Sequence, residues 1–258
     1  MDFTQAIILS IVEGISEFLP ISSTGHLILA SKLLSIPQSE FVKTFEISIQ
    51  FGAILAVVFL YGKRLLIDFK TLKRVIWVFI PTAFLGFLLY GVIKSLLLGN
   101  LMVTVWALII GGVLIIFLEK HLQTREGRQK ITELSLKKSL ILGIIQALSV
   151  IPGVSRSGST IFGGMLLGLG RKEATELSFM VALPLMTAAT GYDLLKNYDL
   201  ISGVNLNVLA VGMAVSFITA VVVIKWLLKY VTDHNFFIFG VYRIIIGLTF
   251  IILFYINP

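Results

Sequence analysis

The chain has 258 residues, of which 57% are hydrophobic and 14% charged, and its mean hydropathy is +0.98. Soluble domains carry roughly 25% charged residues, so the composition excludes an ordinary water-soluble domain and indicates that lipid covers much of the surface. The absence of cysteine excludes disulfides and thiolate chemistry. We attribute the net charge of +7 to cytoplasmic loops of a membrane protein, and not to nucleic-acid binding.

Apolar runs long enough to cross a bilayer recur along the chain, since a spanning helix needs about 20 residues. They are 44–61, 75–97, 101–119, 175–195, 205–229 and 236–256. A cleavable signal peptide is not expected, because Asp2, Glu13 and Glu17 occupy the N-terminal region. The runs predict an all-α polytopic membrane protein with about six full spans, forming a single integral membrane domain.

The basic residues predict the orientation, because cytoplasmic loops carry an excess of lysine and arginine. Loops 62–74 and 120–138 are strongly basic, whereas the link 98–100 carries no charge. We therefore expect the two basic loops inside the cell and 98–100 outside. It follows that segment 1–43 begins and ends outside, and that segment 139–170 begins and ends inside.

Both of these segments are too apolar to be ordinary loops, and each is broken in its middle. Proline, serine and glycine interrupt the first between Pro20 and Gly25, and the second between Pro152 and Ser159. A segment that enters and leaves by one face is a re-entrant hairpin, and its broken tip must lie in protein or in a wet cavity. We expect one such helical hairpin in each half of the chain.

The two broken segments also resemble each other. A shift of about 133 positions pairs Glu13 with Gln146 and Ser22 with Ser155. Because one segment enters from outside and the other from inside, the pattern predicts two inverted-topology repeats whose broken helices meet near the midplane. The expected repeats are about 1–120 and about 139–258, with a cytoplasmic linker at about 120–138.

The first break carries two carboxylates, Glu13 and Glu17, which a helix would place on one face. Their repulsion in a low dielectric calls for a divalent cation, a shared proton or a nearby arginine. Mg²⁺ or Ca²⁺ would suit such oxygen ligands. The alternative is a pair of hydrated carboxylates at an outer mouth. The apolar neighbours favour membrane depth, where ionisable residues mark functional sites.

His26 follows the same break, directly after a run of hydroxyl residues that includes Ser22 and Ser23. A histidine here could act as a general base, a nucleophile or a metal ligand. The alternative is a ring that a backbone carbonyl satisfies. The two nearby glutamates and the hydroxyl groups favour a functional role.

The second break runs from Pro152 to Thr160 and has the composition of an anion cradle. Glycines let the backbone present N–H groups, and the following helix offers its positive N-terminal end. Arg156 adds a planar fork suited to phosphate, while Ser155, Ser157 and Thr160 add hydroxyl donors. The stretch is not a nucleotide P-loop, because no Gly-Lys-Ser/Thr sequence is present.

Three further polar residues lie inside apolar runs. We expect Arg243 to pair with a carboxylate, because an isolated charge at membrane depth is costly. Glu46 and Gln50 lie one helical turn apart, and they either line the cavity or brace the first hairpin.

The two motifs, Glu13-Gly-Ile-Ser-Glu17-Phe-Leu-Pro-Ile-Ser-Ser-Thr-Gly-His26 and Pro152-Gly-Val-Ser-Arg-Ser-Gly-Ser-Thr160, resemble those of the undecaprenyl-diphosphatase family. These bacterial inner-membrane enzymes are also named for bacitracin resistance. The resemblance implies two inverted repeats and removal of one phosphate from a C55 isoprenyl pyrophosphate. It also implies a divalent cation and a site open to the outer face. By resemblance, the acidic motif holds Glu13 and Glu17, the histidine position His26, and the serine-arginine motif Ser155, Arg156 and Thr160.

The expected function is hydrolysis of undecaprenyl pyrophosphate to undecaprenyl phosphate and inorganic phosphate, which recycles a lipid carrier for cell-wall synthesis. Arg156 and the hydroxyl residues would bind phosphate, and Glu13 and Glu17 would hold Mg²⁺ or Ca²⁺. The nucleophile is left open among Ser22, Ser23, His26 and metal-bound water, with direct participation of His26 favoured. The rival function is a transporter or flippase of an anionic lipid or solute. A homodimer is also left open.

Overall fold

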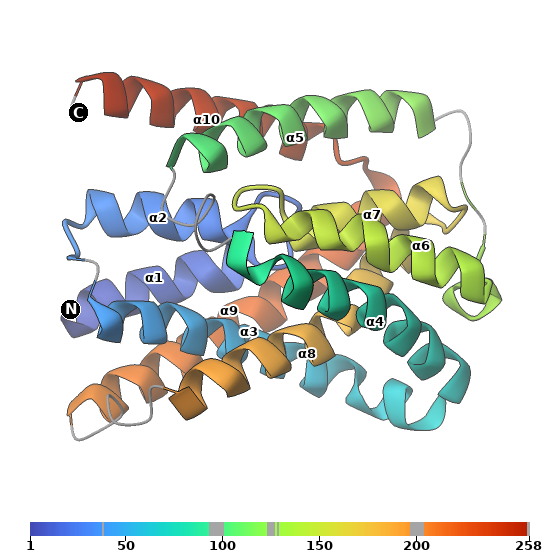
Figure 1. Cartoon of the computed structure of the whole chain (residues 1–258), viewed down its shortest axis with the longest axis horizontal. Coiled ribbons are helices and arrows are strands. Elements are labelled where there is room, and N and C mark those ends of the chain that lie inside the picture. Colours follow the sequence, from blue (N-terminus) through green and yellow to red (C-terminus); the bar gives the residue numbers. More distant parts are fainter. Residues whose placement is uncertain (38, 93–100, 123–126, 128, 197–203, 257–258) are drawn as a thin grey trace.

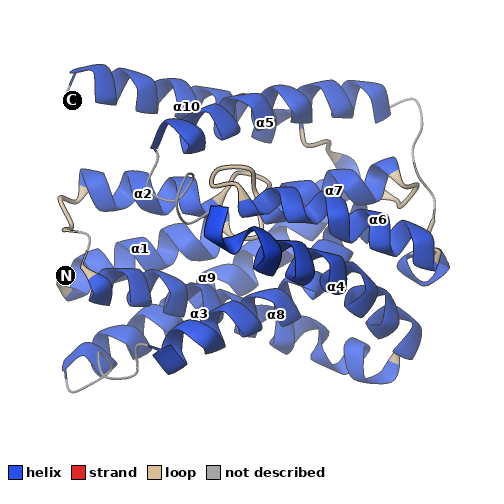
Figure 2. Cartoon of the chain, viewed as in Figure 1, coloured by secondary structure: helices blue, strands red, loops and turns tan. Residues whose placement is uncertain are grey.

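The fold is described from a computed structural model, in which residues 1–37, 39–92, 101–122, 127, 129–196 and 204–256 are described. Within these residues the long elements are all helices, so the predicted all-α fold is confirmed (Figure 2). The first half contains α1 (Phe3–Ser16), α2 (Ser23–Leu33), α3 (Glu40–Ile67), α4 (Phe69–Val92) and α5 (Leu101–Leu122). The second contains α6 (Leu136–Ala147), α7 (Arg156–Leu166), α8 (Arg171–Lys196), α9 (Val204–Asp233) and α10 (Phe237–Ile256). Two short 3₁₀ turns, η2 (Ile131–Glu133) and η3 (Leu148–Val150), flank α6.

Four of the described helices, α3, α4, α5 and α9, are long and apolar enough to cross a membrane. The apolar parts of α1 and α10 are shorter, at Phe3–Ser16 and Phe237–Leu253. The run 175–195, expected as a span, lies in α8, whose first turns are charged and whose middle is buried among its neighbours. The link 98–100 lies outside the described residues.

Large apolar side chains cover the outside of the helices. Phe59, Phe87 and Phe117 are 68%, 86% and 64% exposed. Such surface would be unfavourable in water, but it suits contact with lipid tails. The chain is therefore a multi-pass membrane protein, as its composition predicts.

Both broken segments form two helices separated by an irregular tip. In the first, α1 ends at Ser16 and α2 begins at Ser23; in the second, η3 ends at Val150 and α7 begins at Arg156. The tip loops come together near the middle of the molecule, between α2 and α7 (Figure 2). The serine before each returning helix, Ser22 or Ser155, has a φ of 73°. That left-handed conformation is uncommon outside glycine, and it turns the chain sharply into the helix.

The helices α1 to α5 of the first half correspond, in the same order along the chain, to α6 to α10 of the second half. α2 and α7 each contain 11 residues and begin at equivalent positions of the shifted alignment. α1 packs on α9 while α6 packs on α4, and α5 and α10 lie together along one side of the molecule (Figure 1). These are the pairings that a two-fold arrangement of two five-helix repeats would produce. The opposite orientation of the repeats in a membrane stays a prediction.

Close packing around the first tip depends on small residues and aromatic rings. A Cβ on Gly14 would lie 2.7 Å from Thr219 Cβ, so glycine allows α1 to approach α9 closely. Phe18, which follows α1, packs edge-on against Phe179 of α8 with 5.3 Å between ring centroids. The Arg156 guanidinium lies 5.9 Å from the centroid of the Phe18 ring. The first tip is thus packed against both α8 and the start of α7.

Candidate functional site

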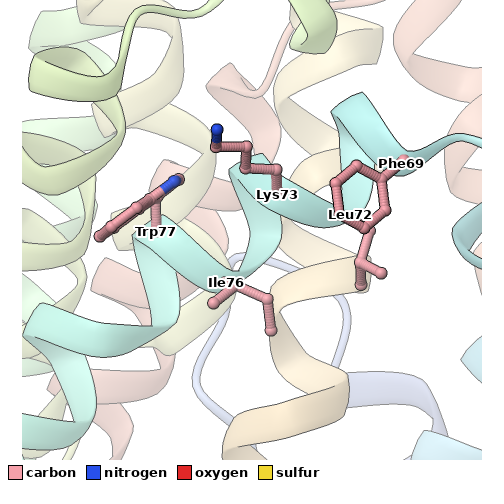
Figure 3. Close-up of a pocket in the computed structure, with 5 residues that line it drawn as sticks. All are labelled: Phe69, Leu72, Lys73, Ile76 and Trp77. Carbon is pink, nitrogen blue, oxygen red and sulfur yellow. The ribbon is translucent and has the colours of Figure 1, made fainter.

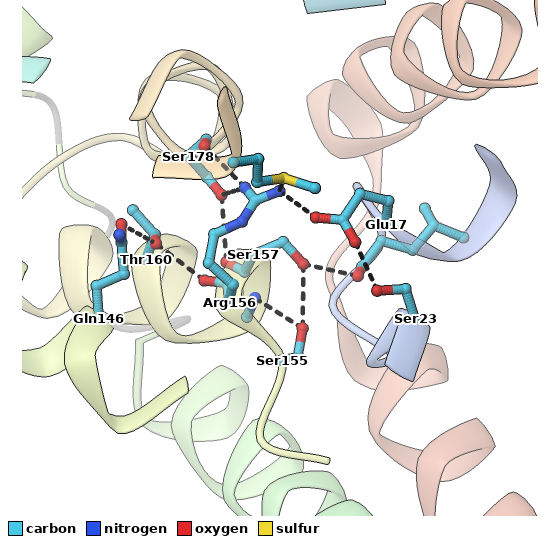
Figure 4. A network of polar contacts seen from close by, with 11 residues as sticks. Glu17, Ser23, Gln146, Ser155, Arg156, Ser157, Thr160 and Ser178 are labelled. Atoms are coloured by element: carbon cyan, nitrogen blue, oxygen red, sulfur yellow. Dashed lines mark hydrogen bonds and ion pairs between the residues drawn. The ribbon is translucent and has the colours of Figure 1, made fainter. Parts of the chain in front are cut away.

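The two motifs meet in a buried ion pair. Arg156 Nη2 donates to Glu17 Oε1 at 2.6 Å, and the two side chains are 11% and 7% exposed. In Figure 4 the carboxylate and the guanidinium point toward each other from opposite sides of the site. Ser23 Oγ donates to the second carboxylate oxygen, Oε2, at 2.5 Å. Of the three forms of compensation expected for the carboxylates, the structure therefore provides the arginine.

Arg156 is held from α8 as well as from the first tip. Its Nη1 donates to the Ser178 carbonyl oxygen at 3.0 Å, and its Nη2 also lies 3.5 Å from the sulfur of Met186. Its Nε is buried and has no hydrogen-bond partner among the described residues. A buried N–H group without an acceptor costs free energy, so this N–H is available to a bound anion.

Glu13 lies one turn before Glu17 and is fully buried. No N–H or O–H group of the described residues donates to either of its carboxylate oxygens, and the Glu17 carboxylate lies close enough to share a proton with it. Its charged neighbours include Glu17 and Glu46, which repel it, and Arg156, which attracts it. A buried carboxylate in this situation needs a proton or a cation. The described residues contain no cluster of three or more His, Cys, Asp or Glu side chains arranged to hold a metal. The burial and the two unsatisfied oxygens of Glu13 are compatible with a single cation ligand, and cation binding stays a prediction.

The hydroxyl groups of the second tip mostly make bonds within the protein. Ser155 Oγ caps α7 by accepting from Gly158 N at 3.1 Å, and it lies 3.1 Å from Ser157 Oγ. Ser157 Oγ donates to the Leu19 carbonyl oxygen at 2.7 Å and so links the two tips. Phosphate binding by Ser155 and Ser157 stays a prediction, and an arriving phosphate would compete with these bonds.

Thr160 and Ser22, the other two hydroxyl residues predicted to bind phosphate, lie in different surroundings. Thr160 Oγ1 donates at 2.8 Å to Gln146 Oε1 and also lies 2.9 Å from the Arg156 carbonyl oxygen. Ser22 is 4% exposed and makes no side-chain bond to cap α2. Thr160 thus braces α7 against α6, whereas the Ser22 hydroxyl is not used to cap its helix.

His26 is bonded outside the network that joins Glu17 to Arg156. Its Nδ1 lies 2.8 Å from the Ser22 carbonyl oxygen, and its Nε2 lies 2.7 Å from the Tyr242 hydroxyl. Because a carbonyl oxygen only accepts, Nδ1 must carry a proton, and in the neutral ring Nε2 then accepts from Tyr242. Tyr242 was not singled out from the sequence, where it is one aromatic residue within an apolar run.

Arg243, next along α10, does not pair with a carboxylate among the described residues. The expectation of an ion pair was therefore wrong, because five backbone carbonyl oxygens take the place of a counter-ion. Glu46 accepts from Ser31 of α2 at 3.0 Å, which supports its role in bracing the first hairpin.

A separate hollow of about 300 Å³ lies on α4. It is lined by Phe69, Leu72, Lys73, Ile76 and Trp77 (Figure 3). One short stretch of a single helix supplies this lining, and Lys73 is its only charged residue, so the hollow does not combine the acidic and basic groups found where the two motifs meet.

A family model described as Bacitracin resistance protein BacA matches residues 6–249. The chain belongs to this family. A protein named undecaprenyl-diphosphatase in Aquifex aeolicus is 53% identical over 246 residues, which are 95% of this chain and 96% of that protein. One of the same name in Wolinella succinogenes is 50% identical over 258 residues, covering 100% of this chain and 99% of that protein. The resemblance inferred from the two motifs is thus confirmed over nearly the whole chain.

Proposed function

We infer that the chain hydrolyses undecaprenyl pyrophosphate to undecaprenyl phosphate and inorganic phosphate, and so recycles the lipid carrier in a bacterial membrane. Membership of the BacA family and the names of its relatives support this activity. The structural observation that carries it is the buried pair of Glu17 and Arg156, which joins an acidic and a basic motif at one point. Such a site offers both charges that pyrophosphate chemistry needs.

Arg156 is the residue we assign to the pyrophosphate. Glu17 neutralises its guanidinium, while Nε has no partner within the described part of the chain. A substrate phosphate would take up this free N–H and share Nη2 with the carboxylate. The N-terminal end of α7, which begins at Arg156, adds backbone donors and a favourable dipole.

Glu13 and Glu17 are the residues we assign to a divalent cation, Mg²⁺ or Ca²⁺. The support is that Glu13 is fully buried with two oxygens that no donor satisfies. When bound, the cation would supply neutralisation of the phosphate oxygens. Glu17 would then contact three partners, namely the cation, the Ser23 hydroxyl from which it accepts, and the Arg156 guanidinium.

Among the candidates Ser22, Ser23, His26 and metal-bound water, the contacts of two side chains support a role as the nucleophile. Ser23 Oγ donates to a Glu17 oxygen, the arrangement in which a carboxylate activates a hydroxyl nucleophile. His26 keeps a lone pair on Nε2, although the Tyr242 hydroxyl occupies it in the absence of substrate. We propose that one of the two forms a bond to the terminal phosphorus as the anhydride P–O bond breaks and undecaprenyl phosphate leaves. Water then hydrolyses the phosphorylated enzyme and releases inorganic phosphate. A phosphohistidine would be lost in acid, whereas a phosphoserine would survive it. Brief reaction with ³²P-labelled substrate followed by acid precipitation separates the two.

We propose that the site opens to the outer face, because the positive-inside rule applied to the basic stretches 62–74 and 120–138 predicts that the first tip enters from outside. The first of these stretches, expected as a loop, is formed by the end of α3 and the start of α4. Since the chain has no cysteine, a single cysteine at exposed Thr24 can be labelled in whole cells with a membrane-impermeant maleimide. Labelling without permeabilisation is expected, and labelling only after it would refute the orientation.

A homodimer is a separate proposal, which light scattering of the detergent-solubilised chain tests.

The experiment that tests the function is phosphate release from undecaprenyl pyrophosphate by the purified chain in detergent. Release should stop with a chelator and resume on adding Mg²⁺ or Ca²⁺, and the Arg156→Ala variant should release little. Arg74→Ala, an arginine change outside the site, is the matched control. Binding or counterflow of the lipid without release would support a transporter instead.

A further inference from the structure

Arg243 of α10 is only 1% exposed and is the largest fully buried side chain among the described residues. All five of its N–H donors point at backbone carbonyl oxygens, at distances between 2.8 and 3.3 Å. The acceptors belong to Pro20, Ala107, Leu108, Gly153 and Val154. An arginine has five such donors, so its hydrogen-bonding capacity is fully used.

These acceptors come from three separate parts of the chain. Pro20 lies in the first tip, Gly153 and Val154 lie in the second tip, and the other two carbonyls belong to α5. Each tip carbonyl lies one or two residues before the positive-φ serine that starts the returning helix, Ser22 or Ser155. Because the tips are not helical, their carbonyls lack the partners that a helix would supply. A single guanidinium therefore ties both tips to each other and to α5.

We propose that Arg243 is a positioning residue for the hydrolysis inferred above. By fixing both tips to α5, it sets the geometry at which Glu17 and Arg156 meet a pyrophosphate. Glu17 lies in the first tip and Arg156, 139 positions later, begins α7 directly after the second tip, so their contact at 2.6 Å depends on how the tips are aligned. Arg243 acts only through backbone groups, since none of its hydrogen bonds reaches the Glu17 or Arg156 side chain.

The surroundings of Arg243 accept a guanidinium and little else. A Cβ on Gly111 of α5 would overlap Nη2 of Arg243 and lie 2.8 Å from its Cζ. Glycine at this position therefore makes room for the planar fork. Lysine would keep the positive charge, but its three donors on a single nitrogen could not reach three segments at once. Arg243→Lys and Gly111→Ala are consequently two independent ways to disturb the same set of bonds.

The first experiment measures phosphate release by the full-length chain in detergent. Arg243→Lys and Gly111→Ala are each expected to lower kcat about 10- to 100-fold with KM changed less than about threefold, because small misplacements of reacting groups are this costly. The double variant should lose no more than the worse single variant. Gly191→Ala is the matched control, since a Cβ there meets nothing within 4 Å. Unchanged kcat in Arg243→Lys, or losses that multiply in the double variant, would overturn the proposal.

The second experiment separates positioning from a general loss of stability, and it does not depend on activity. Amide hydrogen exchange is followed by mass spectrometry in peptides covering 18–23 and 151–156, and in a reference peptide from α9 at 208–220. Arg243→Lys should raise exchange about tenfold or more in both tips and leave α9 unchanged. Exchange that rises equally in all three peptides, or in none, would refute the tie. If the unmodified chain released no phosphate, the proposed function would fail while this measurement still tested the tie.

Discussion

Replacing Arg156 by lysine tests how much of the site depends on the shape of the guanidinium and how much on its charge. The arginine bonds Glu17 and the Ser178 carbonyl oxygen through two different nitrogens and leaves Nε free for a ligand. A lysine keeps one charge on one nitrogen, so it can replace the ion pair or the contact to phosphate, but not both.

The magnitude follows from the bonds lost. One hydrogen bond to a charged group contributes about 1.5–3 kcal/mol, and each 1.36 kcal/mol is tenfold in rate, so kcat/KM should fall about 10- to 150-fold. Alanine also removes the charge and leaves Glu17 buried and unpaired. That change costs about 3–5 kcal/mol of folding stability, so the Arg156→Ala variant should melt at a lower temperature. Because it also loses the positive charge that lysine keeps, its kcat/KM should fall further than that of the Arg156→Lys variant.

The assay is steady-state phosphate release with a melting curve for each variant, so that kcat/KM refers to folded protein. Arg74→Lys, at an arginine outside the site, controls for the chemistry of the replacement. Equal activity of Arg156→Lys and the unmodified chain would show that charge alone is needed. Equal loss in the lysine and alanine variants would show that the charge contributes nothing. Either result refutes the reasoning.

Three other outcomes are expected. Glu13→Gln should raise the Mg²⁺ or Ca²⁺ concentration for half-maximal activity at least about tenfold, because it removes a charged oxygen ligand; an unchanged titration after chelation would exclude Glu13 as a ligand. Tyr242→Phe removes the hydroxyl that donates to His26, and kcat should fall about 2- to 13-fold, the value of one neutral hydrogen bond; full activity would mean that this bond does not orient the ring. Gly14→Val should cost about 1–3 kcal/mol by forcing α1 away from the Ser216 carbonyl oxygen, which lies 2.8 Å from an added Cβ; an unchanged melting temperature would contradict this packing.

The contacts among Glu17, Ser23 and Arg156 also offset the free-energy cost of burying the arginine charge. Glu17 neutralises the charge of Arg156, and Ser23 donates to the other Glu17 oxygen, so the pair carries no net charge and both carboxylate oxygens accept a hydrogen bond. Glu13, by contrast, receives no hydrogen bond on either oxygen from the residues that the structure describes. The charge imbalance of the site is therefore concentrated on Glu13, which is where we expect a cation to bind first and a proton to compete with it.

Several features could be predicted from the sequence because they depend on local pattern. Hydropathy shows that the chain lies in a membrane, and the clustered proline, serine and glycine residues mark both breaks within a few residues. The spacing of Glu13 and Glu17 puts them one turn apart on α1. Even the meeting of Glu17 and Arg156 could be inferred, because broken helices in two related halves have few places to bury their polar tips.

Other features were decided only by the tertiary structure. The partners of Arg243 are backbone carbonyls, which look alike in every sequence, and they lie between 89 and 223 positions away. Tyr242 and His26 are 216 positions apart, and the local sequence around either residue does not predict their hydrogen bond. Ser157, which the sequence offers only as a phosphate ligand, bonds the opposite tip at Leu19. Local pattern thus determines which residues are polar inside the bilayer, whereas their hydrogen bonds depend on how distant helices pack, because each buried polar group must be satisfied by whichever segment the fold brings beside it.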